Sequence, residues 1–151
     1  KELFYLGLKA INKLRDTYKN FQSLKPVQFT ESLYERFNLH FSIGKTRIRD
    51  IIKLRKEIFV KEEGYPLRNI YNPFDTQAFH FIIQDKTIPI GCVSIYLDIG
   101  RGIPLENFIS LRKYQSYRKA EIQKLAIIPE YRKSYISLSL MVISYEFIRF
   151  L

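Results

Sequence analysis

One stretch near the C-terminal end of the chain constrains the fold more than any other. A polar segment, residues 120–124, leads into an apolar run at residues 125–128, which Pro129 ends because proline has no N–H for a strand ladder. A short isoleucine-containing run is typical of a strand covered on both faces. Residues 132–134 are cationic or polar and precede a long apolar helical pattern. The sequence therefore predicts a strand, a short turn and a helix whose free N-terminal N–H groups favour an anion.

The composition restricts the class of protein and its partners. A length of 151 residues with 46% apolar residues suits one packed domain. The net charge of +10 predicts an acidic partner, which charge alone leaves open between nucleic acid, an anionic membrane surface and an acidic protein. A single cysteine, Cys92, excludes an internal disulfide and suits a reducing compartment, so we expect a cytoplasmic protein.

The two ends of the chain carry helical patterns. Residues 1–24 predict a basic amphipathic helix within an N-terminal extension, residues 1–38. Docking of this helix on the core is the favoured interpretation, and contact with a membrane surface or a carrier protein is the alternative. The chain begins with Lys1 and stops within a helical pattern, so we expect a fragment of a longer protein.

The first half of the main domain predicts a strand and a helix. Residues 39–43 alternate like a strand, and Thr46 could cap a helix that runs to about Phe59. Arg55 falls within the apolar stripe of that helix. An inward guanidinium needs an anionic partner, for which Asp75 and Glu121 are the candidates. The periodicity is equally consistent with a side chain that extends out to solvent.

The second half predicts two further strands, residues 79–83 and 88–97. His80 and Cys92 are interpreted as structural residues of these strands, and two histidines with one cysteine spell out no metal cluster. The apolar pattern after Ser134 is interrupted by Glu146 and Arg149, which favours a buried helix over a membrane span.

Two motifs resemble a known superfamily. The segment from Glu121 to Arg132, Glu-x-x-Lys-Leu-Ala-Ile-Ile-Pro-Glu-Tyr-Arg, is similar to the central strand and acyl-donor loop of the GCN5-related N-acetyltransferase (GNAT) superfamily. Its opening, together with Leu-Arg-x-x-Ile-Phe-Val at residues 54–60, most resembles long-chain N-acyl amino acid synthases and acyl-homoserine-lactone (autoinducer) synthases. The resemblance implies an α/β (α+β) GNAT fold with a mixed sheet. Residues 39–151 would form the N-terminal portion of that fold.

The resemblance also implies an activity and a set of site residues. The expected reaction moves a fatty acyl group from a thioester to the amine of an amino acid or related small molecule in a bacterial cytoplasm. Glu121 is the candidate catalytic base, with a structural partnership to Arg55 or Lys124 as the alternative. The expected substrate-binding residues are Arg55, Phe59, Asp75, Phe108 and Lys124. Donor binding is expected at Ala126, Ile127, Arg132, Lys133 and Ser134.

Departures from the family pattern bear on the donor. Tyr135 and Ser137 stand where the family's acyl-donor loop has glycines, and Ser94 and Asn72 replace an arginine and an acidic residue. Bulk beside a pyrophosphate favours acyl carrier protein over coenzyme A as the source of the thioester, with no permanently bound cofactor. The alternatives are an ordinary acetyl-coenzyme A acetyltransferase, an inactive GNAT remnant and a basic nucleic-acid-binding module.

The nucleic-acid alternative depends on residues 112–119, which hold four cations and two tyrosines without an acid. A solvated loop is the favoured interpretation of this segment. Docking of a carrier protein comes second and nucleic acid last.

Overall fold

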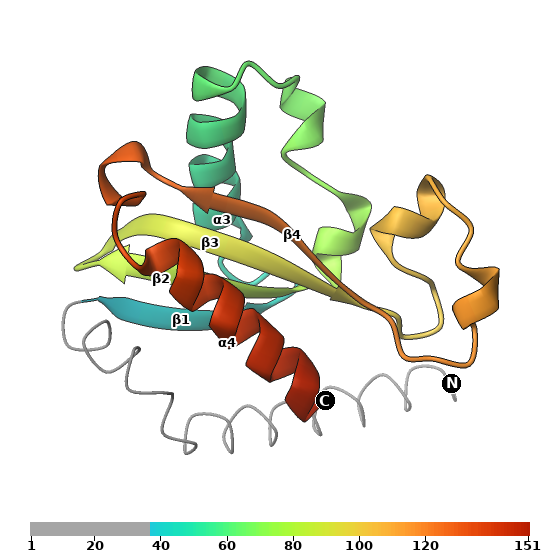
Figure 1. Ribbon diagram of the computed structural model, residues 1–151. Helices are drawn as coiled ribbons and strands as arrows, with labels where there is room; N and C mark the ends of the chain where they lie inside the picture. The colour runs from blue at the N-terminus through green and yellow to red at the C-terminus, as the bar shows by residue number, and fades with distance from the viewer. Residues whose placement is uncertain (1–36) are drawn as a thin grey trace.

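The computed structural model describes residues 37–151, and these form a four-stranded sheet with one helix on each face (Figure 1). Strands β1 (Asn38–Ile43), β2 (Phe79–Asp85), β3 (Ile88–Leu97) and β4 (Ala120–Ile127) pair in chain order, and every pair is antiparallel. Helices α3 (Ile48–Arg55) and α4 (Ile136–Phe150) cover opposite faces. The predicted α+β class is confirmed, but the sheet of residues 37–151 is antiparallel throughout and not mixed. The helix expected at residues 1–24 lies outside the described residues.

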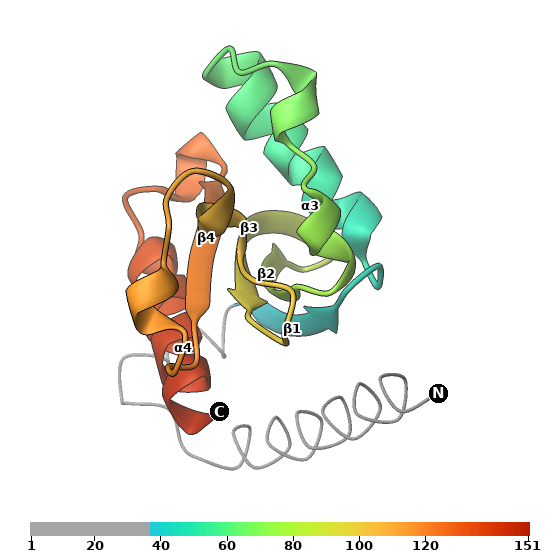
Figure 2. The ribbon, with the colours of Figure 1, turned by 90° about the vertical axis from the view of Figure 1, so that its right-hand side faces the viewer.

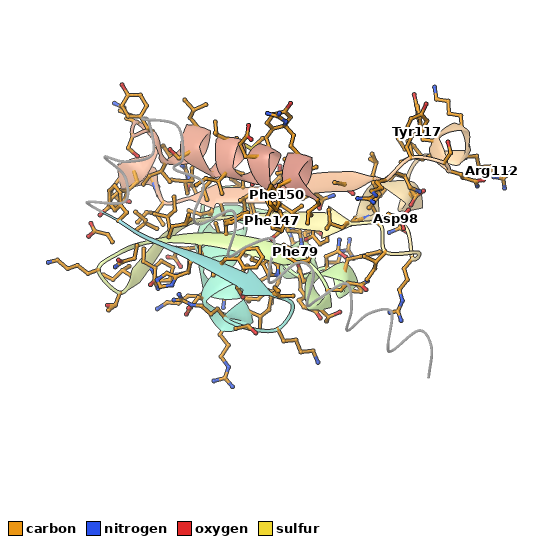
Figure 3. All side chains as sticks on the ribbon, turned by 90° about the horizontal axis from the view of Figure 1, so that it is seen from below. Phe79, Asp98, Arg112, Tyr117, Phe147 and Phe150 are labelled. Atoms are coloured by element: carbon orange, nitrogen blue, oxygen red, sulfur yellow. The ribbon has the colours of Figure 1, made fainter. Side chains whose placement is uncertain are left out.

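The larger core lies between the sheet and α4. Alternation in β2 directs Phe79, Phe81 and Ile83 to this face, where they pack with the buried face of α4. The rings of Phe79 and Phe147 lie 5.3 Å apart between the two layers (Figure 3). Gly91 lets the helix approach closely, because a Cβ there would lie 3.2 Å from Ile136 Cγ2. The predicted buried helix is therefore confirmed, and no helix within residues 37–151 is long and apolar enough to cross a membrane.

A smaller apolar cluster lies between the sheet and α3. It consists of Ile51, Leu54, Ile58, Ile82, Cys92 and Ala126. The helix begins later than predicted, because Arg47 at its N-cap adopts φ 55° and no side chain caps it, so the expected cap at Thr46 is wrong. After Arg55 the chain continues as a π-helix, η1 (Lys56–Glu62). Widened turns of this kind are frequent at functional sites.

The strand bounds follow the predicted pattern with one large difference. The prediction for β3 is confirmed, and β2 extends two residues further than expected. In contrast, β4 begins at Ala120, five residues before the apolar run. Its polar half is also strand, because Ile122 packs in the α4 core while Glu121 and Gln123 point to the opposite face of the sheet.

Residues 98–119, which connect β3 to β4, form a lobe that projects beyond the end of the sheet (Figures 1 and 2). It contains two 3₁₀ turns, η4 (Pro104–Asn107) and η5 (Arg112–Tyr114). Lys119 binds Asp98 at 2.9 Å and Glu106 at 2.6 Å and fastens the base of the lobe. These contacts place Lys119 in an ion-pair cluster instead of the solvated loop expected for residues 112–119, while residues 112–118 are exposed as predicted.

Candidate active site

A β-bulge interrupts β4 where the polar half meets the apolar half. Ser94 pairs with Gln123 and Cys92 pairs with Ala126, so two residues of β4, Lys124 and Leu125, stand opposite Val93 alone. The bulge holds Lys124 at φ 55°, a left-handed conformation that is uncommon for any residue with a side chain. Strain of this kind clusters at functional sites, which directs attention to the surroundings of Lys124.

A buried ion pair lies beside the bulge on the α3 face of the sheet. Arg55 donates from Nη1 to Asp75 Oδ2 at 2.8 Å and from Nη2 to Asp75 Oδ1 at 3.1 Å, and both side chains are 0% exposed. The Nη1 group also donates to the carbonyl of Ile70 at 2.9 Å. The prediction that Arg55 turns inward and pairs with Asp75 or Glu121 is thus confirmed for Asp75.

The Asp75 carboxylate is held by further donors. It accepts hydrogen bonds from the hydroxyl of Tyr96 at 2.7 Å and from the backbone N–H of Asn72 at 2.7 Å. The side chain of Asn72 accepts from the Phe74 N–H and completes a capping box around the short turn Pro73–Thr76. Asn72 therefore acts as a cap that positions Asp75, a role that a neutral amide oxygen performs as well as a carboxylate.

Ser94 and His80 extend the polar network across the sheet. His80 and Ser94 are directly paired on β2 and β3, and His80 Nδ1 lies 2.7 Å from Ser94 Oγ. Ser94 Oγ also accepts from Arg55 Nη2 at 2.5 Å. Burial and the Arg55 charge lower the pKa of His80 to about 4, so this imidazole is neutral at pH 7. The structural role predicted for His80 agrees with these contacts.

The charges in this network shift one another's protonation. Burial tends to raise the pKa of Asp75, but the hydrogen bonds and charge of Arg55 hold it below its ordinary value. Burial raises the pKa of Tyr96 far above its usual range, and it raises the pKa of Cys92 to about 11. Tyr96 therefore remains a hydrogen-bond donor at neutral pH, and Cys92 remains a thiol in the core, as predicted.

Lys124 is the buried cation of this region without a hydrogen bond. Its Nζ lies 4.0 Å from Asp75 Oδ2, and among residues 37–151 no atom accepts a hydrogen bond from it. Burial and the Arg55 charge lower the pKa of Lys124 to about 8, against an opposing effect of Asp75. Burying an ammonium next to a carboxylate that already has its hydrogen bonds destabilises the folded protein. A buried charge of this kind is typical of a residue that binds a ligand.

Glu121 lies three residues before Lys124 on the same strand. Its carboxylate accepts hydrogen bonds from the Leu105 N–H at 2.8 Å and from the side-chain amide of Gln123. These contacts fix its orientation and tie it to the lobe. Among the described residues Glu121 makes no ion pair with Arg55 or Lys124, so the alternative of a structural partnership with either residue is wrong.

The predicted donor turn is occupied by an ion pair from within the chain. Arg132 donates from Nη2 to Glu62 Oε2 at 2.5 Å and from Nε to the carbonyl of Ile127 at 3.0 Å. This pair connects η1 to the turn between β4 and α4. Lys133 is exposed, whereas the Ser134 hydroxyl bonds the Tyr131 carbonyl. A donor phosphate at this turn would compete with Glu62 for Arg132.

The structure brings together only part of the predicted site. Arg55, Asp75 and Lys124 form one cluster, and Glu121 lies on the same strand as Lys124. Phe59 packs beside the α3 cluster with its ring 6.3 Å from that of Tyr65, and Phe108 is 84% exposed in the lobe. Sequence reasoning missed Tyr96 and Gln123, although Tyr96 lies two residues after Ser94 and so shares its face. Among residues 37–151 no cluster of His, Cys, Asp and Glu could hold a metal ion.

Comparison with known proteins concerns the fold. The sequence matches no protein-family model and no curated protein. A putative N-acetyltransferase from Lactobacillus plantarum is similar in structure, with a TM-score of 0.54 and 16% identity over 76% of this chain and 68% of that one. FeeM, an N-acyl amino acid synthase from uncultured soil microbes, has a TM-score of 0.54 and 16% identity over 76% of this chain and 66% of its own. The chain has the GNAT fold.

A third structure extends the range of activities found on this GNAT fold. An aminoglycoside acetyltransferase from an uncultured soil metagenomic sample, solved in complex with sisomicin, has a TM-score of 0.51 and 14% identity over 78% of this chain and 72% of that one. At such identities the similarity extends to the fold, which confirms the GNAT fold predicted from the motifs. One fold carries many different functions, and the site residues determine which one.

Proposed function

We propose that the protein is an N-acyltransferase that moves a fatty acyl group from a thioester to the amine of an amino acid or a related small molecule. The observation that carries this proposal is the bulge in β4, where the Lys124 ammonium, which has no hydrogen bond among the described residues, lies beside the Arg55–Asp75 pair and three residues from Glu121. This arrangement offers a carboxylate for an acceptor amine and a cation for an acceptor carboxylate. The similarity of fold to N-acyl and N-acetyl transferases supports the same reaction class.

The proposed chemistry assigns one proton transfer to Glu121. The acceptor amine attacks the thioester carbonyl, a C–N bond forms and the C–S bond breaks. Glu121 takes the proton that the amine loses and passes it, through water, to the departing thiolate, which leaves as a thiol. Backbone N–H groups near Ala126 and Ile127 would stabilise the oxyanion. The Leu105 N–H and the Gln123 amide orient the Glu121 carboxylate for this task.

Lys124 suits an amino acid as the acceptor. A carboxylate that reached its ammonium would supply the hydrogen bonds that the described residues do not. The Arg55–Asp75 pair is closed to solvent, so its proposed contribution is to hold β3 and the loop at residues 70–76 in place beside Lys124. Substrate contacts by Phe59 and Phe108 remain predictions.

Replacing Glu121 with Gln tests the base. The E121Q variant keeps the shape and the Leu105 hydrogen bond but has no basic oxygen, so kcat is expected to fall about 100-fold. The measurement is thiol release from an acyl carrier protein thioester with a panel of amino acids, across a range of pH. The matched control is E130Q, an exposed carboxylate beyond the end of β4, which should keep full activity.

Two outcomes would contradict different parts of the proposal. Transfer by E121Q at the wild-type rate would remove Glu121 from the base role and leave the reaction class standing. Absence of transfer by the folded wild-type protein, from either thioester donor to any amine of the panel, would contradict the reaction class.

We infer that the thioester is presented by an acyl carrier protein. Tyr135 is 65% exposed at the donor turn, and Arg132 is already bound by Glu62. A pyrophosphate at this turn would therefore be crowded by the Tyr135 ring and would compete with the Glu62 carboxylate. A carrier protein needs only its phosphopantetheine arm in the site. Its usual acidity would also complement the net charge of +10 and raise the association rate.

The Glu62–Arg132 pair provides the test of this donor preference. Wild-type protein is expected to show a higher kcat/KM with the carrier-protein donor than with the same acyl group on coenzyme A. E62Q frees Arg132 from an exposed ion pair, so the KM for the coenzyme A donor should fall by up to about fivefold. E63Q, which removes a neighbouring charge without breaking the pair, is the control. Equal or better kcat/KM with coenzyme A in the wild type would overturn the preference.

A further inference from the structure

The β3–β4 lobe, residues 98–119, concentrates exposed apolar side chains. Six of the fifteen large apolar or aromatic side chains that are exposed among residues 37–151 lie in it. Phe108 is 84% exposed and Tyr117 is 67% exposed. The six are Ile99, Leu105, Phe108, Ile109, Tyr114 and Tyr117. Such a concentration of apolar side chains on a solvent-exposed surface is typical of an interaction site.

The lobe also carries cations, two of which, Arg112 and Lys113, adjoin the exposed Tyr114 in sequence. The lobe holds five Lys or Arg residues and two acidic ones, and both acidic residues, Asp98 and Glu106, bind Lys119 at its base. Within residues 37–151 no carboxylate pairs with Arg112 or Lys113, and the Lys113 ammonium lies 4.8 Å over the Tyr114 ring. Figure 3 shows Arg112 and Tyr117 at the far end of the molecule, with Asp98 nearer the sheet.

Hydrogen bonds and ion pairs hold the two ends of the lobe together at its base. The tip therefore stays in solvent and does not pack against the sheet, α3 or α4. The Asp98 N–H donates to the Lys119 carbonyl at 2.9 Å, and the Lys119 ammonium bridges the two acidic residues. Arg118 donates to the Leu151 carbonyl at 2.5 Å and holds the lobe against the end of α4. Phe108 and Tyr117 remain largely exposed, and Arg112 and Tyr117 lie far from the sheet (Figure 3).

We propose that the tip of the lobe binds an anionic lipid surface. Phenylalanine and isoleucine side chains would enter the boundary between headgroups and acyl chains, with tyrosines at headgroup level. Arg112 and Lys113 would contact lipid phosphates, where each nearby cation contributes about fivefold in affinity. A protruding tip of short turns suits a deformable bilayer better than a folded acidic protein, which needs a matching surface of larger area. The inference does not require the proposed acyl transfer, and it assigns Phe108 to the lipid surface in place of the substrate contact predicted from the sequence.

The absence of tryptophan from the chain makes a site-specific test possible. In the full chain carrying F108W, the single tryptophan should shift its emission to the blue with phosphatidylcholine vesicles that contain phosphatidylglycerol. Brominated lipids should quench it. Vesicles of phosphatidylcholine alone should give no shift. Adding R112Q and K113Q should weaken binding to the anionic vesicles roughly 30-fold.

Matched controls separate the lobe from other surfaces. L138W places a tryptophan on the exposed side of α4, and its emission should not change. K53Q/K56Q removes the same charge from α3 and η1 and should leave vesicle affinity unchanged. Vesicle binding without a shift at F108W would assign the membrane contact to another segment and overturn the proposal. A shift with an acidic carrier protein but not with vesicles would overturn it in favour of protein docking.

Discussion

Replacing Arg55 with Met is expected to lower the free energy of unfolding by roughly 3–5 kcal/mol, because it leaves the buried Asp75 carboxylate without its counter-charge. Urea unfolding of the full chain at pH 7 measures this loss. The remaining donors to Asp75, the Tyr96 hydroxyl and the Asn72 N–H, do not replace a guanidinium bound by two hydrogen bonds. R68M removes an exposed arginine and is the control, with a change within about 0.5 kcal/mol.

The pH dependence of the Arg55 variant identifies the cause of its instability. In the wild type the pKa of Asp75 lies below its unfolded value, so its contribution is present above about pH 4 and is lost as the pH falls through the folded value. Without Arg55, burial, which is the largest influence on Asp75, is opposed only by the weaker effects of the Asn72 and Tyr96 hydrogen bonds, so the pKa of Asp75 is expected to rise. The deficit of R55M should therefore shrink as the pH falls below neutral. A deficit that stays constant with pH would assign the loss to packing instead.

A double variant separates the pair from its two members. If the cost of R55M comes from an unpaired carboxylate, then D75N in the same chain should restore part of the lost stability, although it disturbs the capping box. Additive losses from R55M and D75N would contradict the coupling of the two groups.

The part of this site that sequence predicted depends on local periodicity. Arg55 stands out because it interrupts the apolar stripe that buries Ile51 and Leu54, and the repeat places it on this face. The repeat alone left its direction open, and the contacts with Asp75 show that it turns inward. The strands β2 and β3 follow from alternation, which also determines the face of His80 and Ser94. In these segments the local pattern and the tertiary structure agree.

The features that sequence did not predict depend on contacts between distant segments. The bulge places Lys124 at φ 55°, a conformation that glycine usually adopts. A lysine in the sequence therefore does not predict this backbone conformation. The polar half of β4 lacks the apolar run that identified its second half. Glu62 and Arg132 are 70 residues apart, and the short pattern of the donor turn gave no indication that a carboxylate would occupy it.

The most informative of these unpredicted features is the bulge that holds Lys124. Replacing Lys124 with Met is expected to raise the free energy of unfolding at pH 7 by roughly 3 kcal/mol. Methionine has a similar length and removes a buried ammonium that has no hydrogen bond. The facing charged and titratable groups are Arg55, Asp75 and Cys92, of which Arg55 opposes the lysine charge. K53M, at an exposed position of α3, should change stability by less than about 0.5 kcal/mol.

The stability difference between K124M and the wild type should change with pH in a defined direction. The pKa of Lys124 is about 8 in the folded protein, whereas an unfolded lysine has a pKa of about 10.4. Between these values the unfolded state binds more protons, so wild-type stability rises with pH while K124M lacks this dependence. The advantage of K124M should therefore be full below about pH 8 and disappear as the pH approaches about 10.4.

The same variant connects stability to function. K124M keeps the strained backbone of the bulge, because methionine also has a Cβ, so its gain reports the buried charge alone. If Lys124 awaits the carboxylate of an acceptor, K124M should be more stable than the wild type and should raise KM for an amino acid while leaving KM for a simple amine unchanged. A destabilised K124M, or a KM that rises equally for both acceptors, would mean that the bulge serves the fold and not the binding of an acceptor.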